Sequence, residues 1–246
     1  NLIGGSGDDT FAGNKQSNTF DGGKGSDTID YSNVDDNTVT IIANLTFTQD
    51  NVTFSAGSQE DPDTLKNIEN YTGGKAIDNV TDSIEDNTIN TGENNDLIHL
   101  GMGGDDTIDG GRGKDTLLFD KISNIAGVTV DLSKKTASFD TSNITVNNIE
   151  DVTGSTNSDF ITGDSADNTI IGGAGDDTIY VGHGGTDIVY GGTKDETSST
   201  NNNTLDFSAA SDAVTITFTG TDASQGTATI GSDTTDTVTL YDFKTL

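Results

Sequence analysis

The sequence contains no cysteine and no tryptophan, and Pro62 is its single proline. Without cysteine no disulfide can form, which leaves metal ions as the expected staples of an extracellular chain. Basic residues are scarce, with 11 Lys and Arg against 41 Asp and Glu, and the formal net charge is −30. Because the basic residues form no cluster, nucleic acid is not an expected partner. No apolar run reaches 18 residues, so no transmembrane segment is expected.

Apolar residues are also few, at 30% of the chain, and aromatic residues make up 6%. A high net charge with so little apolar surface usually predicts disorder. Here, however, the acids recur with glycines at a fixed period, which predicts a solenoid whose charge is neutralised by bound cations. No signal peptide opens the chain, and residues 1–3 are similar to the tail of an earlier repeat. We therefore expect a segment of a longer protein.

A nine-residue pattern organises the sequence. It reads G-G-x-G-x-D-x-U-x, where U is a bulky apolar residue, and its clearest copies are 4–12, 22–30, 110–118 and 172–180. Degenerate copies continue the phase and give three repeat blocks, which we predict at 1–30, 73–118 and 154–206. The segments between and after them, at 31–72, 119–153 and 207–246, are strand-rich spacers or caps. Tyr31, Phe119 and Phe207 end the blocks at equal spacings of 88 residues, which indicates repeated modules.

The spacing has a chemical reading. Glycine at positions one, two and four allows tight turns with positive φ, and x-U-x forms a short strand with U inward. One buried apolar side chain per nine residues cannot offset the backbone entropy lost on folding. The position-six carboxylate stands beside turn carbonyls that have no ladder partner. Carboxylate and carbonyl oxygens on a flexible turn favour Ca²⁺ over Mg²⁺.

The nonapeptide resembles the calcium-binding β-roll of the RTX (repeats-in-toxin) family, most like the repeat region of a secreted surface-layer protein or adhesin. The resemblance implies an all-β fold, in which right-handed parallel β-roll or β-helix solenoid blocks alternate with short antiparallel strand-rich segments. Two nonapeptides make one coil, so repeat n stacks on repeat n+2. Several Ca²⁺ ions lie between stacked turns. Each takes the position-two and position-four carbonyls and the Asp of one turn, and the position-one and position-three carbonyls and the Asp of the other.

Carried onto this chain, the resemblance gives four fully specified sites. The first pairs Gly5, Gly7 and Asp9 with Gly22, Lys24 and Asp27. The second pairs Gly74, Ala76 and Asp78 with Thr91, Glu93 and Asp96. The third pairs Gly92, Asn94 and Asp96 with Gly110, Arg112 and Asp115. The fourth pairs Ser155, Asn157 and Asp159 with Gly172, Ala174 and Asp177. Further ligands are expected at Gly101, Gly103, Asp106, Gly173, Gly175, Gly182, Gly184, Asp187, Gly191 and Thr193.

One departure from the pattern recurs. Asn18, Asn87 and Asn168 replace the position-six acid, each in the second repeat of its block. Stacking of n on n+2 puts that repeat on the opposite edge from the first and third. Our hypothesis is that this edge binds fewer or weaker ions, because a neutral amide replaces a carboxylate. Asn87 with Asp106 and Asn168 with Asp187 are still expected to form sites, whereas Asn18 is expected to lack a partner.

No zinc-protease, nucleophile-elbow, P-loop or EF-hand motif is present, so catalysis within this chain is not expected. The sequence predicts a calcium-binding structural region of a secreted bacterial cell-surface protein, folded by external calcium. A surface-layer lattice and an adhesin stalk both fit, with copies of the chain or cell-surface polysaccharide as partners. The competing class is the calcium-dependent tail of a secreted hydrolase or toxin, whose active domain would lie outside this segment.

Overall fold

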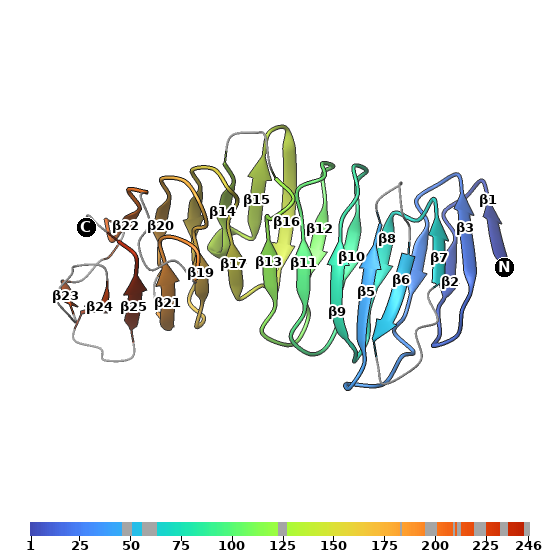
Figure 1. Ribbon diagram of the computed structural model, residues 1–246, viewed down its shortest axis with the longest axis horizontal. Helices are drawn as coiled ribbons and strands as arrows, with labels where there is room; N and C mark the ends of the chain where they lie inside the picture. The colour runs from blue at the N-terminus through green and yellow to red at the C-terminus, as the bar shows by residue number, and fades with distance from the viewer. Residues whose placement is uncertain are drawn as a thin grey trace. The chain divides into compact units, whose positions relative to one another are not determined.

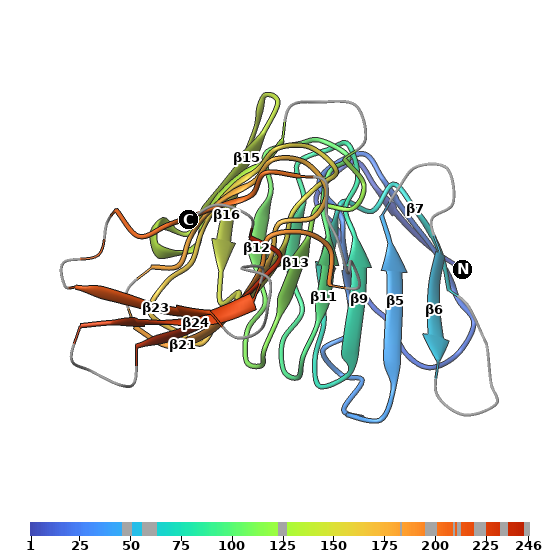
Figure 2. The same cartoon turned by 60° about the vertical axis from the view of Figure 1, so that its left-hand side comes forward.

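The computed structural model describes residues 1–45, 51–55, 63–122, 127–182, 184–194, 201–208, 210, 213–218, 225–231 and 236–243. It divides into two compact units. Unit 1 comprises Asn1–Leu117 and Ser142–Ile149, and unit 2 comprises Leu118–Thr141 and Glu150–Leu246. Each unit holds two sheets of mostly parallel short strands, as Figures 1 and 2 show. The predicted all-β fold with parallel solenoid strands is confirmed.

Unit 1 contains the sheets 1A and 1B. In spatial order, sheet 1A contains β1 (Leu2–Gly5), β3 (Thr19–Gly23), β7 (Asp63–Lys66), β6 (Asn51–Ser55), β5 (Thr40–Asn44), β9 (Ile77–Thr81) and β11 (Leu97–His99). Sheet 1B contains β2 (Thr10–Ala12), β4 (Thr28–Asp30), β8 (Asn70–Thr72), β10 (Thr88–Asn90), β12 (Thr107–Asp109) and β16 (Ser142–Asn147). The strand β13 (Thr116–Leu118) follows β12 in the chain. Successive nonapeptides thus alternate between the two sheets.

Unit 2 repeats this arrangement in the sheets 2A and 2B. Sheet 2A contains β17 (Asp151–Thr153), β19 (Thr169–Ile171), β21 (Thr186–Tyr190), β25 (Thr237–Tyr241), β24 (Gln225–Ile230) and β23 (Val214–Phe218). Sheet 2B contains β15 (Thr136–Phe139), β14 (Thr129–Asp131), β18 (Phe160–Thr162), β20 (Thr178–Tyr180) and β22 (Thr204–Asp206). The 3₁₀ turn η1 (Leu132–Lys134) joins β14 to β15. Within the described residues, no helix is long and apolar enough to cross a membrane.

The apolar residue at position eight forms the core. In sheet 1B, Ile89 pairs in parallel register with Tyr71 below and Ile108 above, and all three are buried. In sheet 2B, Ile179 lies in the same way between Ile161 and Leu205. Each strand therefore points one apolar side chain inward, as a period-two pattern in a three-residue strand requires. Repeat n stacks on repeat n+2, as the family resemblance implies.

The strand-rich segments extend the sheets rather than forming separate layers. The two antiparallel strands expected within 39–54 are present as β5 and β6, with Thr40 opposite Ser55, and residues 46–50 lie outside the described part. They enter sheet 1A between β7 and β9, and Figure 2 shows β6, β5, β9 and β11 side by side. In sheet 1B, β4 pairs directly with β8. The inserted hairpin therefore adds strands to one sheet only.

Candidate metal sites

The position-six acids point into the interior of the turns. Each lies two residues before the buried apolar residue of its strand, so both side chains face inward. Asp27, Asp78, Asp96 and Asp115 have no exposed surface, and four others are at most 2% exposed: Asp106, Asp159, Asp177 and Asp187. A buried carboxylate is costly unless a hydrogen bond or an opposite charge compensates it. The partners of these oxygens therefore decide what the turns can bind.

One carboxylate oxygen is used by the stack itself. The backbone N–H of the position-six residue in repeat n donates to Oδ1 of the position-six acid in repeat n+2. The N···O distance is 2.7 Å from Asp9 to Asp27, 2.8 Å from Asp78 to Asp96, and 3.0 Å from Asp159 to Asp177. Asp96 and Asp115 form the same bond at 2.9 Å. This ladder of bonds sets the register of the turns.

The other oxygen has no donor among the residues that the structure describes. Within these residues, Oδ2 is buried without a hydrogen-bond partner in Asp27, Asp78, Asp96, Asp106, Asp177 and Asp187. Burial raises the pKa of Asp177 to about 8, and burial together with the charge of Asp96 raises the pKa of Asp78 to about 8. Burial likewise raises the pKa values of Asp106 and Asp187 to about 7. Protein groups alone therefore leave these oxygens uncompensated when the carboxyl is ionised.

A backbone carbonyl meets Oδ2 at three of these acids, Asp27, Asp78 and Asp177. A Cβ atom added at Gly172 would lie 2.5 Å from both Asp177 Oδ2 and the Gly191 carbonyl oxygen. The Cβ position of Gly73 likewise falls on Asp78 Oδ2 and on the Thr91 carbonyl. We call this meeting point of the position-six carboxylate and the position-one carbonyl of repeat n+2 the inter-turn site. Once the carboxylate is ionised, two oxygens that face each other in this way fit a hard cation, and Ca²⁺ prefers such a ligand set.

The position-two and position-four carbonyls line the same turns. Gly173 has φ +103°, and a Cβ there would collide with the Ser155 carbonyl of the repeat below. That carbonyl also accepts the N–H of Ala174 at 3.3 Å. The equivalent bonds run from Lys24 to Gly5 at 3.0 Å and from Glu93 to Gly74 at 2.7 Å. Glycine is required here because the stacked backbones approach too closely for a side chain.

The residues predicted for the first, second and fourth sites come together in this way. In the first site, Asp9 Oδ2 and the Gly22 carbonyl meet at Gly4. In the fourth, Asp159 Oδ2 and the Gly172 carbonyl meet at Gly154, although Asp159 Oδ2 also accepts the Ser155 N–H at 2.6 Å. The assignment of these residues as ligands remains a prediction.

The third predicted site differs, because Thr91 stands at position one where the other sites have glycine. The Thr91 hydroxyl donates to the Gly110 carbonyl at 2.9 Å, so a side chain occupies the place where the two oxygens would meet. The Asp96 and Asp115 stack is intact, and Gly92 accepts from Arg112 N–H at 2.7 Å. Asn94, at position four, takes φ +86° and keeps the turn shape.

The three asparagines do not share one edge. Asn18 precedes a strand of sheet 1A, whereas Asn87 precedes a strand of sheet 1B. The expectation that Asn18 lacks a partner was wrong, because its N–H donates to Asp63 Oδ1 at 2.7 Å. Asn87 and Asn168 do lie below Asp106 and Asp187, to which their N–H groups donate at 2.9 Å.

Sequence reasoning missed Asp63 and Asn203, which fill the position-six place as Glu69 does. Asp63 stacks on Asn18, Glu69 Oε2 accepts the Asp27 N–H at 2.8 Å, and Asn203 Oδ1 accepts the Asp177 N–H at 2.9 Å. None follows a glycine turn of the repeat type. Each does stand two residues before a buried apolar residue, namely Leu65, Tyr71 and Leu205. That spacing was the signal that could have identified them.

Position five also has a role that the pattern left open. Its side chain accepts the backbone N–H of position five in repeat n+2, opposite in direction to the position-six bond. Asp86 accepts from Asp105 at 2.8 Å, and Asp105 accepts from Asn143 at 2.8 Å. Asp167 and Asp176 act in the same way on Thr186 and Asn202. Because these carboxylates are exposed, they order the turns without adding a buried charge.

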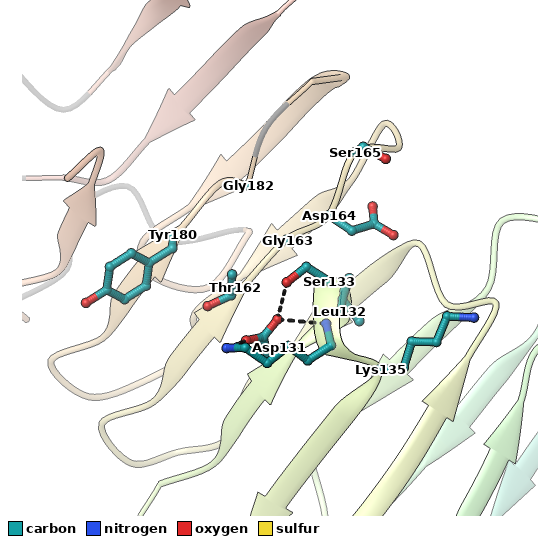
Figure 3. A pocket seen from close by; sticks show the side chains of 11 residues that line it. Asp131, Leu132, Ser133, Lys135, Thr162, Gly163, Asp164, Ser165, Tyr180 and Gly182 are labelled. Atoms are coloured by element: carbon teal, nitrogen blue, oxygen red, sulfur yellow. Dashed lines mark hydrogen bonds and ion pairs between the residues drawn. The ribbon is translucent and has the colours of Figure 1, made fainter. Parts of the chain in front are cut away.

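Unit 2 also has a cavity of about 510 Å³ beside η1, shown in Figure 3. Its rim includes Asp131, which accepts hydrogen bonds from the Ser133 hydroxyl at 2.6 Å and the Lys134 N–H at 3.0 Å. The lining has no histidine or cysteine. In the described residues, no three His, Cys, Asp or Glu side chains cluster to hold a metal. The inter-turn sites instead bring one carboxylate oxygen together with a backbone carbonyl.

Comparison with protein families gives the same answer as the geometry. The model of the RTX calcium-binding nonapeptide repeat matches in four copies, at residues 2–37, 72–105, 86–117 and 153–184. The repeat blocks belong to the RTX family. A search of curated proteins found no match. RTX nonapeptide repeats bind Ca²⁺, and their β-roll is a structural element rather than a catalytic one. The matched segments of this chain are therefore calcium-binding RTX repeats.

Proposed function

We propose that this chain is the calcium-binding structural region of a secreted bacterial cell-surface protein of the surface-layer type, which folds when it meets calcium outside the cell. One observation supports the proposal above all others. In the part of the chain that the structure describes, no donor reaches the buried Oδ2 of Asp27, Asp78 or Asp177, and a carbonyl oxygen meets each of these atoms at a position-one glycine. A divalent ion supplies the positive charge that these oxygens need. Folding and ion binding are then one process.

Each position of the nonapeptide has its own role in this proposal. The position-six carboxylates hold the ion with Oδ2, and their Oδ1 accepts the backbone N–H of the preceding coil. The glycines at positions one, two and four exclude side chains, so that carbonyls of successive turns come within reach of the same ion. The apolar residues at position eight fix the strands but bury little area. Low cytosolic calcium would keep the chain unfolded for export, and the family's usual route is type I secretion.

The repeated modules, the strand-rich segments that extend the same sheets and the lack of disulfides support a surface-layer component. Its partners would be copies of itself or cell-surface polysaccharide. An adhesin stalk is the alternative with the same physics. The tail of a secreted hydrolase or toxin is the alternative from another class, and it would require a catalytic or membrane-active domain elsewhere in the parent protein.

Two measurements test this proposal. Calorimetric titration should show several Ca²⁺ ions per chain, and a chain that takes up no calcium would overturn it. Immunogold electron microscopy of producing cells should show the protein in an ordered surface array. Label on extended fibres would favour the adhesin, and label only in the medium would favour the enzyme or toxin tail.

A further inference from the structure

Residues 67–72 end the first inserted segment, and they stack on the nonapeptide 22–30 as a repeat turn does, although they contain no glycine. The N–H groups of Glu69 and Asn70 donate to the Asp27 carbonyl at 3.1 and 2.9 Å, and Tyr71 pairs in parallel with Ile29. Glu69 stands two residues before the buried Tyr71, in the place of a position-six acid. The nonapeptide 22–30 is therefore covered by residues 67–72, which do not follow the nonapeptide pattern.

Glu69 makes the bond that a position-six aspartate makes. Its Oε2 accepts the Asp27 N–H at 2.8 Å, and Asp27 Oδ1 accepts the Asp9 N–H at 2.7 Å one coil below. The longer glutamate side chain reaches the bond from a turn of different shape. Two carboxylates, from Asp27 and Glu69, are thereby brought to the same turn.

Asn67 supplies the carbonyl. Its backbone is left-handed, with φ +48°, and its side-chain amide donates to Asp21 Oδ1 at 2.8 Å, which ties the residue to the turn below. The Asn67 carbonyl oxygen and Asp27 Oδ2 both fall on the Cβ position of Gly22. The Thr91 and Gly191 carbonyls take this place at inter-turn sites within the blocks. Asp27 is fully buried, and none of the described residues donates a hydrogen bond to its Oδ2.

We propose that a divalent cation, Ca²⁺, binds between the nonapeptide 22–30 and residues 67–69, held by Asp27 Oδ2, the Asn67 carbonyl and the Glu69 carboxylate. This site rests on the proposed function and adds to it an ion outside the nonapeptide pattern. Asp27 and Glu69 are 42 residues apart in the sequence. The ion links the residues on either side of the inserted segment, and residues 67–69 cap the row of ions in the first repeat block.

Two neighbouring features support this assignment. The Asn-Ile-Glu tripeptide recurs at 148–150, and the Asn148 carbonyl, at φ +51°, meets Asp115 Oδ2 at Gly110. On its other side, Glu69 presents its carbonyl to the Asn87 amide, which donates to it at 2.8 Å. The turn that contains Asn87 is thus joined to Glu69 by an ordinary hydrogen bond. An ion is needed only between Glu69 and the nonapeptide 22–30.

The test is the number of bound ions in the full chain, counted by native mass spectrometry and calorimetry. Glu69→Gln keeps an acceptor for the Asp27 N–H but removes the charge, so the fold is expected to persist in calcium. We expect it to hold one Ca²⁺ fewer than the unsubstituted chain, or to bind one ion at least tenfold more weakly. Glu85→Gln, which removes an exposed carboxylate near Glu69, should bind like the unsubstituted chain.

An equal ion count and equal affinities in Glu69→Gln would overturn the site while leaving the proposed function intact. An unsubstituted chain that binds no calcium would instead overturn the proposed function. If Glu69→Gln fails to fold, the pair Asn67→Gly and Asn67→Val decides. Glycine keeps the left-handed carbonyl and should keep the ion, whereas valine disfavours that backbone and should weaken the same single site. Equal binding by both Asn67 variants would then reject the proposal.

Discussion

At the scale of single residues, the account depends on the two oxygens of the position-six carboxylate. Asp177 shows both roles, because Asn203 and Asp159 continue the backbone ladder through it while its Oδ2 faces the Gly191 carbonyl. The first role needs only an acceptor, and an amide can fill it. The second needs negative charge. An Asp→Asn change therefore separates stacking from ion binding.

Asp177→Asn should raise the calcium concentration at the folding midpoint about tenfold, equivalent to about 1.4 kcal/mol. The amide oxygen can still accept the Asp159 N–H, so the fold at saturating calcium should persist. Calcium titrations followed by circular dichroism would measure the midpoint. The matched control is Asp176→Asn, which removes an exposed charge one residue earlier. Equal midpoints for the two variants would contradict the role given to Oδ2.

The pH dependence follows from the same carboxylates. Burial raises their folded-state pKa values to about 6 at Asp96, about 7 at Asp106 and Asp187, and about 8 at Asp78 and Asp177. A raised folded-state pKa contributes stability below the unfolded value near 4 and loses it as pH rises through 6 to 8. In calcium-free solution, the folded fraction should therefore increase as pH falls from 8 to 5.

With calcium bound, the trend should reverse, because protons compete with the ion for the same oxygens. Thermal unfolding at several pH values, with chelator and with saturating calcium, would measure both trends. A calcium-free chain that loses structure on acidification from pH 8 to 5 would show that the buried carboxylates are compensated by something other than a cation.

At the scale of elements, the junctions between repeats and inserted segments use two different devices. Where an acid stacks on a repeat, charge and carbonyl converge and an ion fits. Where Asn87 stacks on Glu69, the amide closes the junction alone: its Nδ2 donates to the Glu69 carbonyl at 2.8 Å, and its Oδ1 accepts the Ser83 N–H at 2.7 Å. Asn168 repeats both bonds with Glu150 and Asp164, each at 2.9 Å.

Asn87→Asp would place a carboxylate against the Glu69 carbonyl and remove a donor. We expect a loss of about 1–3 kcal/mol in the free energy of unfolding at low calcium, and a smaller loss at high calcium. Urea unfolding at two calcium concentrations would measure it. Asn90→Asp, an exposed change on the same strand, is the control. An unchanged calcium response in both Asn87→Asp and Asn168→Asp would remove the distinction between the two devices.

The junction at Asn18 uses a third arrangement. The Tyr31 hydroxyl donates to Asp63 Oδ2 at 2.5 Å, and the Asn18 N–H takes Oδ1, so both oxygens of this fully buried carboxylate have donors. Tyr31→Phe should cost about 1–3 kcal/mol in calcium without changing the number of bound ions. Native mass spectrometry and urea unfolding would show this, with Tyr190→Phe as the control. Loss of an ion in Tyr31→Phe would contradict the arrangement.

The sequence predicted the repeating parts of the fold better than the junctions. The family resemblance implied the stacking of n on n+2, and period and composition predicted the inward position-eight residues and the β5–β6 hairpin. Asp63, Glu69 and Asn203 could not be found through glycines, because segments of other turn shapes deliver them to the same place. A carboxylate from a shorter or longer turn meets the hydrogen-bond ladder because of the folded backbone, not because of its spacing in the sequence. Thr91 likewise fills an inter-turn site that the pattern alone would leave open.

At the scale of the whole molecule, the net charge of −30 and the low apolar content set the conditions for folding. Dissolved salt screens exposed charges that lie more than about a Debye length apart. It screens charges buried between stacked turns much less. Monovalent salt should therefore not substitute for calcium. Magnesium should substitute poorly, because it demands a stricter octahedral ligand set than flexible carbonyl turns provide.

The most direct test of the central claim is far-ultraviolet circular dichroism of the full chain at pH 8. Spectra would be recorded in excess chelator, with monovalent salt or magnesium added, and with calcium. The account predicts a disordered spectrum in chelator, little change with salt or magnesium, and a β-strand spectrum only when calcium is present. A β-strand spectrum of full intensity in excess chelator would contradict it.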